Sequence, residues 1–224
     1  MLTEFDLMYM GRSYARLPLY KEALEKWGLI HRNRVLDAGC GYGAWTFTLS
    51  KLNNSVIGIE RDGNKSNISM QLAEENTQNI DIYTCDIESL PGKAYGLGKF
   101  DGILCFHTIY YTHDWKKTLK SLASLMTPNG IMYINIATLD CFIHMISSGD
   151  KTTRQMGIDA INDAKRKEKG LEYETMSGLP IEKEEFEEEL TKLNLVIDGS
   201  GHDIIARHPG VIGYVVKKCV HNDM

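Results

Sequence analysis

Three glycines, Gly39, Gly41 and Gly43, occupy alternate positions immediately after an apolar run that ends in Asp37. Glycine is needed where the chain adopts backbone angles that other residues avoid, or where a ligand lies against bare backbone. An amphipathic segment follows, so the glycines form the turn between a strand and a helix. We predict that this turn is the floor of a nucleotide-like site. A turn that is merely tight is the weaker interpretation, because the acid and the apolar strand accompany the glycines.

The charge of Asp37 bears on which ligand lies at this turn. The glycines also fit the dinucleotide pattern Gly-x-Gly-x-x-Gly/Ala, through Gly39, Gly41 and Ala44. A dinucleotide would place its pyrophosphate here, where the carboxylate would repel it. S-adenosylmethionine carries an ammonium and a sulfonium and no phosphate, so it suits the acid better. An NAD(P)-dependent oxidoreductase remains the alternative from another enzyme class.

A second group of reactive side chains, His107, Tyr110, Tyr111 and His113, follows the predicted strand 100–106. In an open α/β sheet the ligand lies beyond the carboxyl ends of the strands, so this loop faces the reacting group. If the reaction transfers a group to a hydroxyl or ammonium of a substrate, this acceptor must lose a proton. The unperturbed pKa of histidine suits a residue that takes this proton. We predict that His107 is the general base and that Tyr110 or Tyr111 orients the acceptor. The open alternative is that His107 only packs against the cofactor or the neighbouring helix.

The glycine turn resembles the first motif of the class I SAM-dependent methyltransferases, which has the form acid-x-Gly-x-Gly-x-Gly. The resemblance covers residues 30–136 closely and 180–217 in pattern only. It implies a doubly wound, Rossmann-like α/β sheet of seven strands, mostly parallel with the last strand antiparallel. It also implies transfer of a methyl group from S-adenosylmethionine to an oxygen or nitrogen of a small-molecule acceptor, with S-adenosylhomocysteine as product. A module of this fold that binds a partner without catalysis is a third possibility, which the complete set of acids disfavours.

Further acids stand at the ends of the next two predicted strands. Glu60 ends the strand 55–60, where a carboxylate is offered to both ribose hydroxyls. Asp86 follows the strand 80–84, and the resemblance implies that it accepts a hydrogen bond from the adenine amino group; the alternative is that it caps the turn before Pro91. The predicted cofactor-binding residues are Asp37, Gly39, Cys40, Gly41, Gly43, Glu60, Arg61, Asp86, Ile87 and Phe106, of which Arg61 either flanks the adenine or is simply exposed.

The remaining elements are predicted from apolar periodicity and from Gly and Pro stops. A helix near 20–27 precedes the first strand, and a strand near 131–136 follows a helix that starts at Asp114. The other predicted elements are helices at 45–52, 65–75 and 181–193 and an antiparallel pair of strands at 195–197 and 211–216.

Residues 137–179 form an insertion that we predict to be a helical lid over the acceptor. It contains an apolar cluster (Phe142, Ile143, Met145, Ile146) and a helix through Met156, Ala160, Ile161 and Ala164 that ends at Gly170. Its basic residues (Arg154, Lys165, Arg166, Lys167) either attract an anionic substrate or, as we favour, form a solvated face. The resemblance implies that the N-terminal segment folds over the cofactor, which makes Tyr9, Arg12 and Tyr14 candidates to contact it. The alternative is that the two tyrosines only pack against the first helix.

Composition limits the class of protein. A chain of 224 residues that is 43% hydrophobic and 25% charged suits one domain, residues 1–224, with a substantial core. A net charge of −5 disfavours a broad nucleic-acid footprint. The five cysteines lack C-x-x-C pairing, and no run approaches the length of a membrane span, which together predict a cytoplasmic protein. No metal is expected, since His107, His113 and Asp114 lack a recognised ligand spacing; a homodimer is left open.

Overall fold

The structure is a computed structural model that describes residues 16–76, 79–92, 96–173, 177–202 and 209–219. The predicted cofactor contacts of Tyr9, Arg12 and Tyr14 lie outside the described residues and stay predictions.

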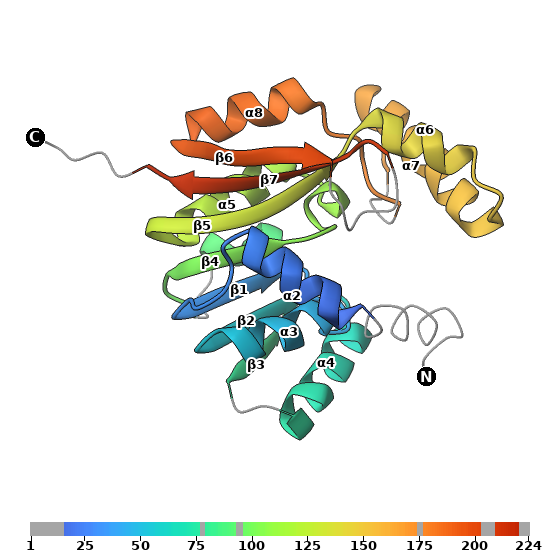
Figure 1. Cartoon of the computed structure of the whole chain (residues 1–224). Coiled ribbons are helices and arrows are strands. Elements are labelled where there is room, and N and C mark those ends of the chain that lie inside the picture. Colours follow the sequence, from blue (N-terminus) through green and yellow to red (C-terminus); the bar gives the residue numbers. More distant parts are fainter. Residues whose placement is uncertain (1–15, 77–78, 93–95, 174–176, 203–208, 220–224) are drawn as a thin grey trace, which may run out of the picture.

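One seven-stranded sheet organises the chain, with the order β3-β2-β1-β4-β5-β7-β6 (Figure 1). All neighbours pair in parallel except β7, which runs antiparallel to both β5 and β6. The predicted fold class is therefore confirmed. The strands are β1 (Arg34–Ala38), β2 (Ser55–Glu60), β3 (Ile80–Thr84), β4 (Phe100–Cys105), β5 (Met126–Ala137), β6 (Leu195–His202) and β7 (Val211–Lys218).

Helices cover both faces of the sheet (Figure 1). Two separate apolar clusters mark the two faces, one beneath α2 and α3 and the other beneath α5 and α8. The helices on the first face are α2 (Leu17–Lys26), α3 (Ala44–Leu52) and α4 (Gly63–Asn76); those on the second are α5 (Trp115–Leu125) and α8 (Lys183–Lys192). Short 3-10 helices, η1 (Ile87–Gly92) and η2 (Ile109–Tyr111), follow β3 and β4. The polar site must therefore form at the strand ends, which the helices leave open.

The alternation of side chains along β1 decides where Asp37 points. Val35 belongs to the cluster beneath α2 and α3, and Leu36 belongs to the cluster on the other face. Successive side chains of a strand point to opposite faces, so Asp37 lies on the same side as Val35. The carboxylate is thereby directed at α3, the helix that follows the glycine turn.

The insertion forms two helices, α6 (Leu139–Ile146) and α7 (Lys151–Glu168), which project beyond the end of the sheet (Figure 1). The predicted second helix is confirmed, and Gly170 follows it with a φ of 67°. The predicted apolar cluster is wrong for Ile143, which is 49% exposed, whereas Phe142 is buried in the main core. Cys141, Phe142 and Met145 form the buried face of α6, and Ile143 lies outside that face.

β5, β6 and β7 are longer than predicted, and β7 extends to Lys218. β5 begins at Met126, because Met126 pairs with Phe100 before the register shifts to Gly102 opposite Ile131. β6 continues to His202 along β7. Its residues Val196 and Ile197 are exposed, since β6 is the last strand in the sheet order.

Candidate active site

The glycine turn has the backbone that its sequence predicts. Gly39, Gly41 and Gly43 have φ values of 85°, 55° and 85°, in the left-handed region that side chains with a Cβ avoid. A Cβ on Gly39 would overlap the side chain of Thr108, with only 2.8 Å to its Cβ. A Cβ on Gly41 would meet nothing within 4 Å. The turn is thus closed by the β4 loop at Gly39 and has bare, open backbone at Gly41.

Asp37 lies beneath this turn and is 2% exposed. The Thr46 hydroxyl, in the first turn of α3, donates to Oδ2 of Asp37 at 2.6 Å. Burial raises the pKa of Asp37 to about 7; the Thr46 hydrogen bond opposes this shift, and the charge of Glu60 adds to it. Near neutral pH the carboxyl therefore exchanges readily between its neutral and charged forms, and a nearby cation would favour the charged form.

Replacing Asp37 should make the free energy of unfolding less dependent on pH. The pKa of this carboxyl rises from 3.8 to about 7 in the folded chain, so between these values the folded state keeps a proton that the unfolded chain has released. The stabilisation is complete below pH 3.8 and is lost as the pH rises through 7, a change of up to about 4 kcal/mol. Chemical denaturation of the wild type at pH 5 and pH 8 should show the loss, and the Asp37→Asn variant should lack it. Asp81→Asn, at an exposed carboxyl on β3, is the control; equal pH dependence in wild type and Asp37→Asn would refute a protonated Asp37.

Glu60 connects β2 to the glycine turn. Its Oε2 accepts a hydrogen bond from the Gly41 N–H at 2.9 Å, and its Oε1 accepts one from the Asp62 N–H at 2.9 Å. The two parallel strands β1 and β2 bring it there, with Ala38 opposite Ile59. Each carboxylate oxygen has a second lone pair, so the same group retains acceptor capacity for a hydroxyl. The structure thus places the predicted ribose ligand directly beside the open glycine.

Asp86 caps the turn that follows β3. This is the alternative that the sequence analysis gave to a hydrogen bond with adenine. Its Oδ1 accepts a hydrogen bond from the Glu88 N–H at 2.9 Å, and its carbonyl accepts from the Ser89 N–H at 3.0 Å. Ile87 is 5% exposed, with its side chain in the core. The cap accounts for the acid without a ligand. The adenine contact of Asp86 and the cofactor contact of Ile87 stay predictions.

The other predicted cofactor residues have structural contacts of their own. Arg61 is exposed and its Nη1 donates to the carbonyl of Tyr111 at 3.2 Å, which links β2 to the loop after β4. The Phe106 ring packs against Trp45, with 4.9 Å between centroids. Cys40 is buried, which raises the pKa of its thiol and keeps it neutral. Their contacts with a cofactor stay predictions.

The loop after β4 brings the predicted catalytic residues together. The ring Nδ1 of His107 is hydrogen-bonded to the Tyr110 hydroxyl. Tyr110 is buried and packs against Tyr111, with 4.7 Å between ring centroids. His107 has a φ of 50°, and its N–H donates to Oδ1 of Asn135 at 2.7 Å. Asn135 was not among the predicted site residues. It is a polar residue within the apolar run of β5, and this pattern could have pointed to it.

The insertion is attached to this loop at its carboxyl-terminal end. The Leu179 N–H donates to the Tyr110 carbonyl at 2.7 Å, and Lys167 Nζ and the Tyr173 hydroxyl both lie 3.4 Å from the His113 carbonyl. A groove of about 550 Å³ lies between α7, the start of α5 and the segment before α8. Such attachment beside His107 is consistent with the predicted lid, which stays a prediction.

Two arginines of the insertion have local partners. Arg154 donates to the Ser148 carbonyl at 2.8 Å and Arg166 donates to the Glu172 carbonyl at 2.6 Å. Both contacts close turns at the ends of α7. This arrangement fits the solvated face that we favoured over a site for an anionic substrate.

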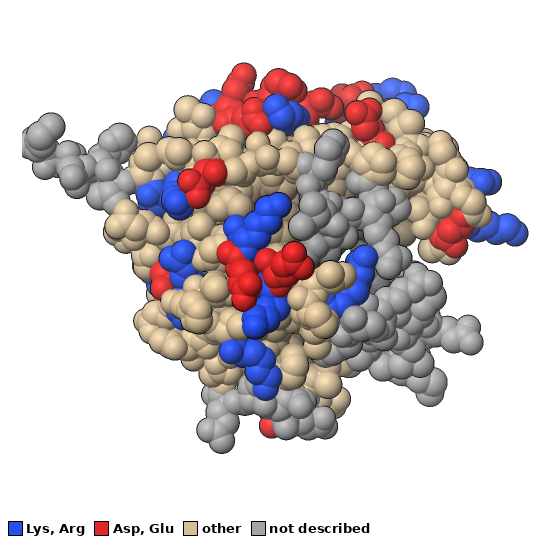
Figure 2. Space-filling model, viewed as in Figure 1, with Lys and Arg blue, Asp and Glu red and all other residues tan. Residues whose placement is uncertain are grey.

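In Figure 2 acidic side chains gather over α8, which contains Glu184, Glu185, Glu187, Glu188 and Glu189.

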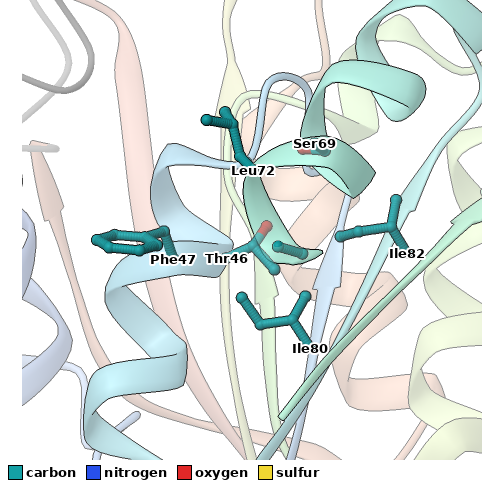
Figure 3. Close-up of a pocket in the computed structure, with 8 residues that line it drawn as sticks. Thr46, Phe47, Ser69, Leu72, Ile80 and Ile82 are labelled. Atoms are coloured by element: carbon teal, nitrogen blue, oxygen red, sulfur yellow. The ribbon is translucent and has the colours of Figure 1, made fainter. Parts of the chain in front are cut away.

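Figure 3 shows a small gap with a volume of about 10 Å³. The labelled residues that line it are Thr46, Phe47, Ser69, Leu72, Ile80 and Ile82. That volume holds at most about one water. It is a packing gap between α3, α4 and β3, and a nucleoside cannot enter it.

Comparison with known proteins identifies the fold and the family. A family profile described as "Methyltransferase domain" matches residues 31–194, most of the chain. The chain belongs to this family. The match begins just before β1 and includes the glycine turn, Glu60, Asp86 and the His107 loop.

The chain is also similar to individual methyltransferases. A ubiquinone biosynthesis O-methyltransferase from Pelagibacter ubique is 35% identical over 109 residues, 48% of this chain and 42% of the relative. The magnesium protoporphyrin IX methyltransferase of Synechocystis, solved with bound S-adenosylhomocysteine, has a TM-score of 0.64 at 14% identity and covers 98% of this chain and 89% of its own. The N-methyltransferase NodS from Bradyrhizobium japonicum has a TM-score of 0.59 at 14% identity and covers 96% and 99%. The chain spans less than half the length of three ubiquinone-biosynthesis relatives that it matches.

None of the described helices has both the length and the apolar composition needed to cross a lipid bilayer. Within the same residues, no three His, Cys, Asp or Glu side chains are grouped as metal ligands.

Proposed function

We propose that this methyltransferase-family chain transfers the methyl group of S-adenosylmethionine to an oxygen or nitrogen of a small-molecule acceptor. One observation carries the proposal: the Glu60 carboxylate is hydrogen-bonded to the open glycine of the turn, directly above the buried Asp37. Two carboxyl groups at this turn favour a cationic cofactor over a pyrophosphate. This is the reason to prefer the proposal to an NAD(P)-dependent oxidoreductase.

The residues present fit S-adenosylmethionine by their chemistry. Glu60 would hold the ribose hydroxyls, since its oxygens retain lone pairs at the carboxyl edge of β2. The open backbone at Gly41 would lie against the cofactor, because no side chain occupies that direction. Asp37 would offset the ammonium charge, for which its pKa of about 7 provides a carboxyl that ionises at little cost. When bound, the cofactor supplies an electrophilic methyl group on a sulfonium leaving group.

His107 is proposed to take the proton of the acceptor. In a neutral ring with the proton on Nδ1, that N–H donates to the Tyr110 oxygen and Nε2 carries the basic lone pair. The opposite tautomer would place the proton on Nε2 and remove the base. Tyr110 is buried, and close packing holds its ring in one position, which favours a fixed partner for Nδ1. The remaining task of the protein is to align the acceptor with the methyl group.

The acceptor class follows from this assignment. A hydroxyl or an ammonium needs a base, and a carboxylate does not. The Pelagibacter relative is an O-methyltransferase by name and NodS is an N-methyltransferase, so both outcomes occur on related chains or on this fold. The acidic surface over α8 disfavours a nucleic-acid acceptor there.

Calorimetric titration with S-adenosylmethionine tests the proposal. We expect binding of about −7 to −8 kcal/mol, in the micromolar range, and no comparable binding of NAD(H). Glu60→Ala should weaken binding by about 1–3 kcal/mol, because a charge-assisted hydrogen bond is lost. Asp86→Ala tests the adenine contact, and Glu188→Ala, at an exposed acid on α8, is the control. If Glu60→Ala and Asp86→Ala both bind as tightly as the wild type, this site is not the cofactor site.

A further inference from the structure

We propose that Asn135 is a positioning residue that fixes the backbone and the ring of His107 for proton transfer, an inference that rests on the proposed function. Asn135 has no exposed surface, and its Oδ1 accepts the His107 N–H at 2.7 Å. The two residues are 28 positions apart in the sequence, so the contact comes from the sheet and not from a local turn.

The contact replaces a hydrogen bond of the sheet. The last parallel pair between β4 and β5 joins Cys105 to Ile134, and β4 ends there while β5 continues to Ala137 along β7. The next N–H groups of the departing chain lose their strand partner in a partly buried place. A buried donor left unpaired costs about 1–3 kcal/mol. The amide of Asn135 supplies the acceptor from the longer strand.

The backbone of His107 needs this support. A φ of 50° is uncommon for a residue with a Cβ and costs about 1–2 kcal/mol. Such a conformation persists only where its surroundings hold it in place. The contact joins two uncharged groups, the backbone N–H of His107 and the side-chain amide of Asn135. Its effect is therefore to fix the position of the His107 backbone.

Asn135 is itself held firmly on the strand. It pairs with Gly213 of β7, and Tyr133, two residues before it on the same face, stacks on Trp27 with 3.5 Å between ring centroids. The amide therefore has little freedom to follow a displaced loop. A fixed His107 backbone places the ring where Nδ1 meets the Tyr110 hydroxyl. When Nδ1–H donates in this contact, the basic lone pair is on Nε2.

Two variants separate positioning from a purely structural role. Asn135→Ala removes the acceptor and should lower kcat by about 10–100-fold, while the Kd of S-adenosylmethionine changes less than about twofold. Asn135→Asp keeps an acceptor of the same shape and should restore most of the rate. Its carboxyl lies next to His107, so the acid limb of its pH profile should move to higher pH.

A spectroscopic readout keeps the test independent of turnover. In NMR spectra of ¹⁵N-histidine-labelled protein, wild type and Asn135→Asp should show the His107 proton mainly on Nδ1, and Asn135→Ala should show a mixture of tautomers. The inference would be overturned if wild type and Asn135→Ala had the same tautomer populations and the same pH profiles. It would also be overturned if Asn135→Asp lost as much of the rate as Asn135→Ala. Absence of transfer by the wild type would reject the proposed function alone, because the NMR measurement still decides the role of Asn135.

Discussion

Replacement of His107 by alanine should lower kcat by about 10²–10⁴-fold and leave the affinity for S-adenosylmethionine nearly unchanged. The ring is the proposed acceptor of the proton, and the proposed cofactor contacts lie elsewhere, at Glu60 and the glycine turn. The wild-type rate should fall at acid pH with one titrating group, since a protonated imidazole has no basic lone pair. Steady-state kinetics from pH 5 to 9, with cofactor binding measured on the same samples, provides the test.

Tyr110→Phe is the matched control for this result. It removes the hydroxyl that meets Nδ1 of His107 and keeps the buried ring, so it should lower the rate less than His107→Ala does. A small effect of His107→Ala, together with a pH profile without an acid limb, would reject general-base catalysis. The acceptor would then be a carboxylate, or alignment alone would drive transfer.

Gly39→Ala should destabilise the chain by about 2–5 kcal/mol and disrupt the cofactor site. A left-handed backbone costs alanine about 1–2 kcal/mol, and overpacking against Thr108 costs about 1–3 kcal/mol more. The Thr108 side chain cannot easily yield, because its hydroxyl donates to the Phe106 carbonyl at 2.9 Å. Denaturant unfolding measures the loss of stability, and calorimetry measures the loss of cofactor binding.

Two further variants isolate the clash. Position 41 has a left-handed φ of 55° but open space where a Cβ would lie. Gly41→Ala should therefore lose only the stability that a left-handed backbone costs alanine. The double variant Gly39→Ala/Thr108→Gly removes the opposing side chain and should recover part of the stability. Equal losses for Gly39→Ala and Gly41→Ala, without recovery in the double variant, would contradict the close contact between the turn and the β4 loop.

Local patterns predicted much of this structure because their causes are local. The alternate glycines predicted the turn since left-handed backbone at Gly39, Gly41 and Gly43 follows from the absence of a Cβ. Glu60 and Asp37 could be brought together from sequence, because parallel strands end at the same edge of a sheet. The family match then confirmed the predicted family.

Features that depend on tertiary contacts were harder to predict. Asn135 contacts a residue 28 positions away, at the place where β5 continues beyond the end of β4. The side chain of Asp86 had two chemically reasonable partners, and the sequence could not show that a backbone N–H takes one oxygen. Ile143 is apolar like the rest of its predicted cluster, and its exposure follows from the orientation of α6.

A crystal structure of the chain with S-adenosylhomocysteine tests the central claim most directly. We expect the ribose hydroxyls within hydrogen-bond distance of the Glu60 carboxylate, bare Gly41 backbone against the ligand, and the thioether sulfur facing the loop that carries His107. A ligand that lies in the groove between α7 and α5, or whose ribose lies away from Glu60, would contradict the proposed site.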